Sequence, residues 1–98
     1  MSFLKMDAKL IYKMHIALPN PLPEIYFKFK SKTYVISKCR ISKGNYSGNP
    51  GKVIGNYENG IVVLCKNGSI VLDFLRSKNS NKKFPAKNFL RSGDQIND

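Results

Sequence analysis

Residues that commonly carry out catalysis are few and far apart in this sequence. His15 is the only histidine, and no nucleophile stands at a spacing that would place it beside this imidazole. The acidic residues are Asp7, Glu24, Glu58, Asp73, Asp94 and Asp98. Most of them fit better as helix caps or turn residues than as partners in acid–base chemistry. We therefore expect no catalytic residues, because the alternative of a self-sufficient catalytic domain lacks an active-site constellation.

Metal and cofactor chemistry also lacks the residues that it needs. A zinc site takes about four ligands at short spacings, whereas the candidates here are His15, Cys39 and Cys65. Both cysteines lie in apolar, strand-like runs, which is typical of buried free thiols in a reducing compartment. The run GNPG at 48–51 precedes a strand, whereas loops that cradle phosphates open a helix. We expect no metal and no cofactor.

Charge is the strongest compositional signal. The 17 Lys and Arg residues outnumber the 6 Asp and Glu residues, which gives a net charge of +11. A surface this positive attracts polyanions, of which RNA, DNA and anionic membranes are the usual candidates. The alternative is compositional, since abundant Lys, Asn and Ile also follow from an AT-rich genome without selection for binding.

The candidate binding surface combines basic residues with aromatic rings. Tyr26 and Tyr34 would stand among basic residues on the outward faces of two strands, where a ring can stack on an unpaired base. Alternatively, both rings pack beneath a helix, which is the commoner fate of rings in strands. Basic side chains would contact phosphates. The predicted nucleic-acid contacts are Lys28, Lys30, Lys38, Arg40, Lys43, Lys52, Lys78, Lys82 and Lys83.

A helix precedes the strands that carry these residues. Leu4, Ala8, Ile11, then Met14 or His15, and Leu18 recur at steps of three and four residues, which predicts an amphipathic helix. Asp7 suits the N-cap, because its carboxylate can accept the free amide hydrogens of the first turn. The three prolines that follow end the helix.

Alternating apolar and polar residues predict five short strands after the prolines. The predicted strands span residues 25–30, 33–41, 52–57, 61–66 and 69–75. In the second strand we expect Val35, Cys39 and Ile41 on the inner face, with Lys38 and Arg40 opposite.

Turn residues separate these strands. Ser31-Lys32 is expected to turn the first hairpin, and Asn59-Gly60 and Asn67-Gly68 to supply the positive φ angles of tight turns in a three-stranded meander. Residues 76–83 are predicted to form a cationic loop. Pro85 then favours a short helix of one or two turns.

The predicted fold is mainly β: a small, partly open antiparallel barrel of OB-like, Greek-key type, with an N-terminal helix and a short C-terminal helix. The length indicates a single domain over residues 1–98. No apolar stretch approaches the roughly 20 residues that span a bilayer. The N-terminus lacks the continuous apolar segment of a signal peptide. We expect a cytoplasmic protein without a membrane partner.

Three short motifs are similar to a known family. Pro50–Val53, Asn59–Val63 and Cys65–Gly68 resemble the C-terminal domain of the formyltransferases, whose best-known member is methionyl-tRNA formyltransferase. The N-terminal run FLKMDAKLIYKMHIAL resembles the helix that opens this domain, and AKNFLRSG resembles the segment that closes it. The resemblance therefore covers nearly the whole chain.

The resemblance implies a small open barrel whose basic surface helps to hold tRNA. In the whole enzymes, a separate N-terminal domain binds formyltetrahydrofolate and carries the catalytic residues, and this sequence contains none of that domain. We therefore predict an accessory, non-catalytic domain that contributes nonspecific electrostatic binding of tRNA, with a formyltransferase catalytic domain as its second partner. The alternative is a packing or dimerisation tail, since sugar-nucleotide formyltransferases carry a similar one.

Overall fold

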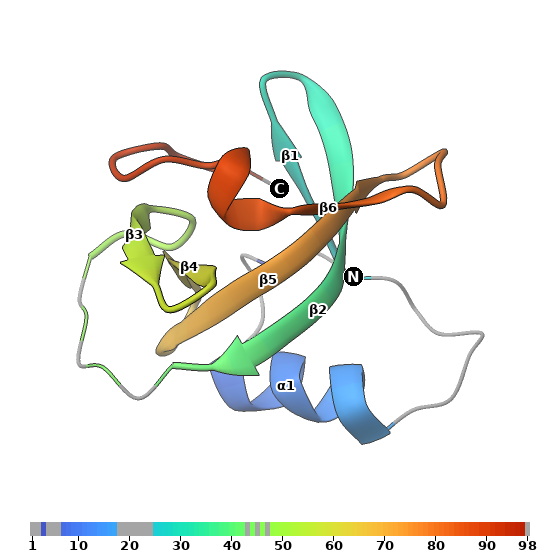
Figure 1. The fold of residues 1–98 in the computed structure, drawn as a ribbon. Helices are drawn as coiled ribbons and strands as arrows, with labels where there is room; N and C mark the ends of the chain where they lie inside the picture. The colour runs from blue at the N-terminus through green and yellow to red at the C-terminus, as the bar shows by residue number, and fades with distance from the viewer. Residues whose placement is uncertain are drawn as a thin grey trace.

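The computed structural model describes residue 3 and residues 7–17, 25–42, 44, 46 and 48–97, apart from the side chains of residues 14–17. Its elements are α1 (Ala8–Ala17), β1 (Tyr26–Phe29), β2 (Lys32–Ile41), β3 (Val53–Tyr57), β4 (Gly60–Leu64), β5 (Ser69–Ser77), β6 (Lys83–Pro85) and the 3₁₀ turn η2 (Ala86–Asn88). The strands form one curled antiparallel sheet (Figure 1). The predicted mainly β, partly open barrel is confirmed.

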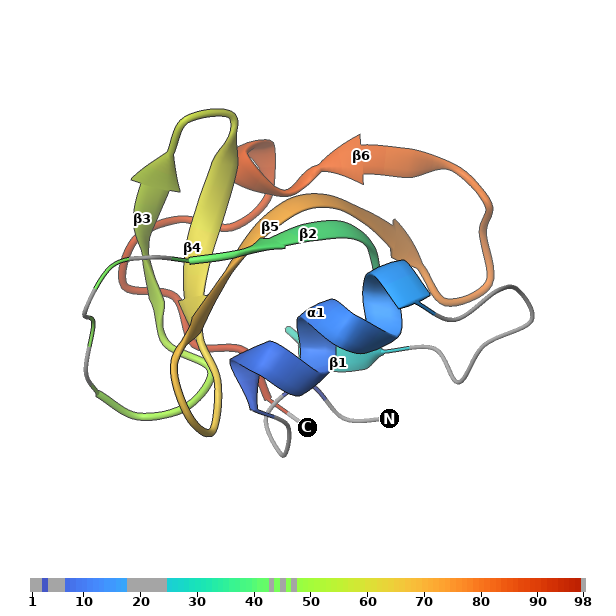
Figure 2. The ribbon, with the colours of Figure 1, turned by 90° about the horizontal axis from the view of Figure 1, so that it is seen from below.

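The strands follow a Greek-key order. The sheet runs β1-β2-β5-β4-β3, and β6 pairs with β5 away from this path. β3, β4 and β5 form the predicted meander, while the long connection from β2 to β3 leaves β2 beside β5. Figure 2 shows β2 and β5 running side by side behind α1.

Helix α1 begins directly after Asp7, the residue predicted to be its N-cap. The N–H of Ile11 donates to the Asp7 carbonyl at 3.0 Å. The Asp7 carboxylate accepts a hydrogen bond from Asn67 Nδ2 at 3.0 Å, so Asp7 ties α1 to the β4–β5 turn. Ile11 is fully buried. The residues predicted to bound the apolar stripe, Leu4 and Leu18, lie outside the described residues.

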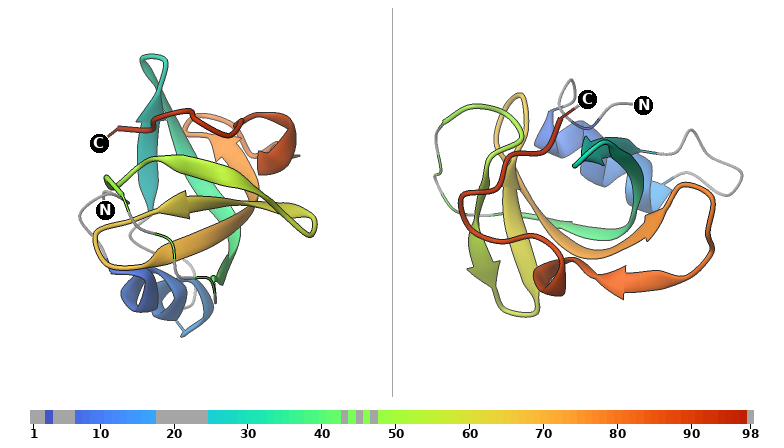
Figure 3. Two further views of the ribbon diagram at one scale, coloured as in Figure 1. Left: turned by 90° about the vertical axis from the view of Figure 1, so that its left-hand side faces the viewer. Right: turned by 90° about the horizontal axis from the view of Figure 1, so that it is seen from above.

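The β1–β2 hairpin turns one residue earlier than predicted. Phe29 pairs with Lys32, so the turn residues are Lys30 and Ser31, with φ angles of 50° and 68°. Two positive φ angles match the twist of the flanking strands, although neither residue is glycine. Figure 3 shows this hairpin projecting beyond the rest of the barrel.

The two Asn-Gly pairs of the meander differ in their backbone φ angles and in their positions in the turns. Tyr57 pairs with Gly60, so the turn residues are Glu58 and Asn59, and the positive φ of 53° belongs to Glu58. Gly60 is instead the first residue of β4 and has no positive φ. Gly68 does adopt a positive φ of 97°. The prediction of a positive φ is therefore confirmed for Gly68 and wrong for Gly60.

Two β-bulges, one on each strand, interrupt the β2–β5 ladder. The register shifts on both sides of the Lys38–Phe74 pair, which leaves Ser37 unpaired on β2 and Asp73 unpaired on β5. Because each strand gains one residue, the register is restored beyond the bulges. Lys38 and Phe74 both end up exposed on the outside of the barrel.

The bulges change which residues of β2 face the core. Tyr34 and Ile36 belong to the core cluster before the bulges, and Cys39 belongs to it after them. Val35 is buried but lies outside this cluster, and Ile41 is 36% exposed. The core residues change from even to odd positions across the bulges, since a period of two holds only in an uninterrupted ladder. The predicted inner face was right for Cys39 and wrong for Ile41, which is the last residue of β2.

A sixth strand was not predicted. β6 pairs with β5 through Leu75–Phe84 and two flanking pairs, so the predicted cationic loop at 76–83 is partly strand. Pro85 ends β6, a position that suits proline because β6 is an edge strand, and it is also the N-cap residue of η2. The predicted C-terminal helix is the single 3₁₀ turn η2.

The C-terminal segment closes the barrel between β3 and β1. The N–H of Ile96 donates to the carbonyl of Gly51 at 2.9 Å, and Lys28 and Asn97 exchange two backbone hydrogen bonds of 2.7 Å. The side chain of Ile96 is fully buried in the core. Figure 3 shows the segment running from η2 across the barrel toward β1. Residues 93–97 therefore take the place of a closing strand.

The two ends of the barrel are covered by different elements. Ala8 and Ile11 of α1 enter the core at one end. At the other, the residues around η2 meet the hairpin in an aromatic cluster of Phe29, Tyr34, Phe84 and Phe89. Figure 1 shows α1 and η2 on opposite sides of the sheet.

Candidate nucleic-acid interface

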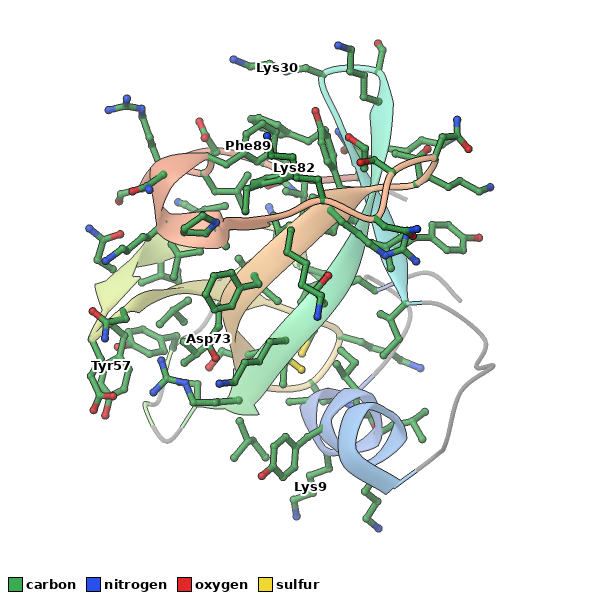
Figure 4. The ribbon with its side chains drawn as sticks, turned by 45° about the vertical axis from the view of Figure 1, so that its right-hand side comes forward. Lys9, Lys30, Tyr57, Asp73, Lys82 and Phe89 are labelled. Atoms are coloured by element: carbon green, nitrogen blue, oxygen red, sulfur yellow. The ribbon has the colours of Figure 1, made fainter. Side chains whose placement is uncertain are left out.

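Lysines gather at the end of the barrel opposite α1. The hairpin-end surface, as we term it, consists of Lys28, Lys30, Lys32, Lys78, Lys82 and Lys83, all of which are exposed. The hairpin and the β5–β6 connection adjoin, because the N–H of Lys78 donates to the Thr33 carbonyl at 3.2 Å. Figure 4 shows Lys30 and Lys82 on the side of the molecule opposite Lys9 of α1.

Most of this surface was predicted from the sequence. Lys28, Lys30, Lys78, Lys82 and Lys83 were all expected to contact nucleic acid. Lys32 was not, because it was assigned to the turn. The one-residue difference in the hairpin makes Lys32 the first residue of β2, where its side chain is exposed.

Two other predicted lysines, Lys38 and Lys52, do not join this surface. Lys38 lies in the middle of β2 opposite Phe74. Lys52 precedes β3 and forms an isolated bridge with Gln95 of the closing segment. Lys43 lies outside the described residues. The predicted set is therefore divided between one cluster and isolated positions.

Arg40, also a predicted contact, is held by two carboxylates. Its Nε and Nη2 donate to Oδ2 and Oδ1 of Asp73 at 3.0 and 2.8 Å, and its Nη1 donates to Oε2 of Glu58 at 2.8 Å. These hydrogen bonds, chiefly those to Asp73, raise the pKa of the guanidinium above its usual value. The three side chains together carry a net negative charge. Arg40 thus joins β2, β5 and the β3–β4 turn and adds no positive potential for phosphates.

The two tyrosines have different environments. Tyr34 is 8% exposed, and its ring centroid lies 4.7 Å from that of Phe89 and 6.0 Å from that of Phe27. It therefore packs in the aromatic cluster near η2, neither stacking on a base nor lying under the helix α1. Tyr26 is half-buried at the start of β1.

A basic cleft between β3 and η2 was missed by sequence reasoning. It has a volume of about 570 Å³ and is lined by Gly55, Asn56, Lys87, Asn88, Leu90, Arg91 and Ser92. Lys87 and Arg91 are both exposed. Their spacing of four residues, within the predicted C-terminal helix, would have placed both on one face and was the available signal.

The carboxylates of the described residues leave the hairpin-end surface uncompensated. Arg40 engages Glu58 and Asp73, the backbone N–H of Arg91 donates to Asp94 at 2.9 Å, and the fourth carboxylate precedes α1. Within the described part of the chain, the ion pairs found are those of Arg40. Among the described residues, the lysines of the hairpin-end surface therefore form no ion pair with a carboxylate.

Groups for metal chemistry are not assembled in the part of the chain that the structure describes. Among these residues, no cluster of His, Cys, Asp and Glu could hold a metal ion. No helix in the same part is long and apolar enough to cross a membrane.

The cysteines are expected to resist thiol reagents in the folded protein. Burial raises the pKa of Cys39 to about 12 and that of Cys65 to about 11. The thiolate is the reactive form, so alkylation by iodoacetamide at pH 8 should be at least about 100-fold slower in buffer than in urea. A Cys39→Ala variant assigns the rates to each thiol, and equal rates in the two solvents would contradict the buried placement.

The raised pKa values of the two cysteines are expected to make the folded protein less stable at alkaline pH. Both folded pKa values are raised, so the stability that the thiols contribute is complete below the unfolded value of 9.0. It is lost as pH rises toward about 12 at Cys39, because the unfolded thiol ionises first and favours the unfolded chain.

Comparison with known proteins identifies a family and a relative. A family model described as "Formyl transferase, C-terminal domain" matches residues 1–93. A methionyl-tRNA formyltransferase from Geotalea daltonii is 34% identical over 71 residues, which cover 72% of this chain and 22% of that protein. The chain thus spans about 22% of the length of this relative.

Proposed function

Because the chain belongs to the formyltransferase C-terminal domain family, we propose that it is an accessory domain that holds tRNA for a formyltransferase catalytic domain. The hairpin-end surface carries the proposal, since its lysines are exposed and form no ion pair within the described residues. The relative from Geotalea daltonii acts, by its name, on methionyl-tRNA.

The chemistry of this surface favours phosphates over bases. Lysine presents a mobile point charge on a long stem, which binds phosphate oxygens without fixing their orientation. Of the two rings predicted to stack on bases, Tyr34 is buried and Tyr26 is half-buried. Contacts of this kind position a nucleic acid without reading its sequence. We therefore propose nonspecific electrostatic binding of the tRNA backbone.

Salt and charge removal test this proposal together. Fluorescence anisotropy of labelled tRNA should show affinity falling about 100-fold between 50 and 200 mM salt, as expected for about four phosphate contacts. A Lys28→Ala/Lys30→Ala/Lys32→Ala variant should bind about 10-fold or more weakly at 50 mM salt. A duplex DNA of equal length measures how far the surface distinguishes the two nucleic acids.

The matched control removes the same charge from the opposite end of the molecule. A Lys9→Ala/Lys13→Ala/Lys66→Ala variant loses three exposed lysines near α1 and the β4–β5 turn. It should retain tRNA affinity to within about three-fold, because screening shortens the reach of surface charges to about 10 Å. Salt-independent binding, or no binding at 50 mM salt, would overturn the proposal.

Exposed apolar side chains favour a second candidate function, a packing or dimerisation tail. Ile41, Tyr57 and Phe74 are 36%, 46% and 38% exposed. A stable interface buries on the order of 800 Å² on each partner. Sedimentation of the unmodified domain at high concentration distinguishes the two functions: a dimer that fails to bind tRNA would favour this one.

A further inference from the structure

We propose that the cleft between β3 and η2 binds a phosphate group of the RNA backbone. This inference rests on the proposed function and names one site at which the RNA backbone would bind. The two cationic lining residues, Lys87 and Arg91, come from η2 and the segment that follows it, while Gly55 and Asn56 of β3 form the facing wall. The volume of about 570 Å³ has room for a phosphate with an attached ribose.

The charge of the cleft is positive. Neither Lys87 nor Arg91 forms an ion pair within the described residues. The nearby carboxylate of Asp94 accepts the backbone N–H of Arg91 at 2.9 Å, and Asp94 is not among the lining residues. An anion in the cleft would therefore meet two cations and no lining carboxylate.

The polar lining suits a phosphate more than a bare halide. The side chains of Asn56 and Asn88 each offer amide N–H donors to phosphate oxygens. The Ser92 hydroxyl is not available as a donor to phosphate, because it donates to the Ile54 carbonyl at 2.7 Å. Arg91 adds a planar guanidinium, whose paired N–H groups match two oxygens of one phosphate.

The wall of the cleft carries no side chain at Gly55. A Cβ added at Gly55 would meet no atom within 4 Å, and the φ angle of Gly55 is not positive. Gly55 is therefore required neither by backbone conformation nor by packing. A side chain added at this position would therefore start in open space at the wall of the cleft.

The position of the cleft favours an extended polyanion over a free phosphate ion. The ring of Phe89, two residues before Arg91, lies 5.4 Å from that of Phe29 in the hairpin. The aromatic cluster thus joins the hairpin carrying Lys28, Lys30 and Lys32 to the segment that forms the cleft. One RNA backbone could engage both.

Two variants test the cleft by different means, with tRNA anisotropy as the measurement. Gly55→Val adds bulk at the wall of the cleft and leaves the net charge unchanged, while Lys87→Ala/Arg91→Ala removes two charges from it. Each should weaken tRNA binding about 3- to 10-fold. Lys9→Ala/Lys13→Ala removes two charges from α1 and should change affinity less than 2-fold. Thermal melts of all variants confirm that they fold.

Titration of the unmodified domain with inorganic pyrophosphate, followed by amide NMR, distinguishes RNA from a free anion. Millimolar binding with shifts at Gly55, Asn56 and Ser92, beside much tighter binding of tRNA, is expected. If pyrophosphate binds at the cleft but tRNA does not bind, both the proposal that the cleft binds RNA and the proposed function are overturned. If tRNA binds but the α1 and cleft variants weaken it equally, or Gly55→Val leaves it unchanged, the cleft is overturned and the proposed function stands.

Discussion

Removing residues 94–98 is expected to abolish cooperative folding. These residues include Ile96, whose fully buried side chain belongs to the core. The truncation also removes the backbone hydrogen bonds from Val53 to Asp94, from Ile96 to Gly51 and between Lys28 and Asn97. Losing a buried isoleucine side chain costs about 2–5 kcal/mol, and each hydrogen bond about 0.5–1.5 kcal/mol. The sum approaches the roughly 5–15 kcal/mol by which small domains are stable.

The measurement is a thermal and urea melt followed by circular dichroism. Ile96→Ala isolates the packing contribution and should lower the free energy of unfolding by about 2–5 kcal/mol. Asn97→Ala keeps the backbone hydrogen bonds and should change it by less than about 0.5 kcal/mol, since this side chain is exposed. A truncated chain that melts cooperatively within a few degrees of the full chain would show that β1 and β3 need no closing segment.

The parts of the fold that could be predicted are those specified by local patterns. The apolar stripe through Ala8 and Ile11 and the change to alternation at Phe27 and Phe29 are periodic signals that do not depend on distant residues. The closing segment could not be predicted in the same way. Ile96 is a single apolar residue among polar ones, and its role comes from β1 and β3, which are distant in sequence.

The bulges in β2 illustrate a second limit. Their positions depend on a register with β5, and nothing within β2 marks Ser37 as unpaired. Strict alternation counted from Cys39 therefore placed Tyr34 outside, whereas Tyr34 is found in the core. Tertiary pairing overrides the local period wherever an extra residue enters a ladder.

The positive charge of the candidate site could be predicted from the sequence, whereas its geometry could not. Counting lysines found most of the hairpin-end surface, since side chains of lysine are almost always exposed. The same count could not show that Arg40 is neutralised, because Asp73 and Glu58 reach it only through the β2–β5 pairing and the β3–β4 turn. The cleft requires β3 to lie beside η2, and no local pattern contains that information.

Gly60→Ala is expected to be strongly destabilising although the substitution adds one methyl group. A Cβ at this position would lie 2.5 Å from Cγ1 of Val71 and 2.9 Å from both the Leu72 carbonyl and Oδ1 of Asp73. Backbone atoms of β5 cannot move away without disturbing the β4–β5 ladder. Overpacking of this kind costs about 1–3 kcal/mol. Displacing Asp73 would also loosen its hydrogen bonds to Arg40, so we expect the upper part of that range.

Gly55→Ala is the matched control on the neighbouring strand of the same hairpin. An added Cβ at Gly55 meets nothing within 4 Å, so the methyl group causes no clash. The unfolded chain loses conformational freedom, and the variant should be unchanged or more stable by about 0.4–1 kcal/mol. In thermal melts, Gly60→Ala should unfold roughly 10–30 °C below Gly55→Ala, at about 4–8 °C per kcal/mol for a domain of this size. Equal melting temperatures would mean that β4 and β5 are not as closely packed at Gly60 as described.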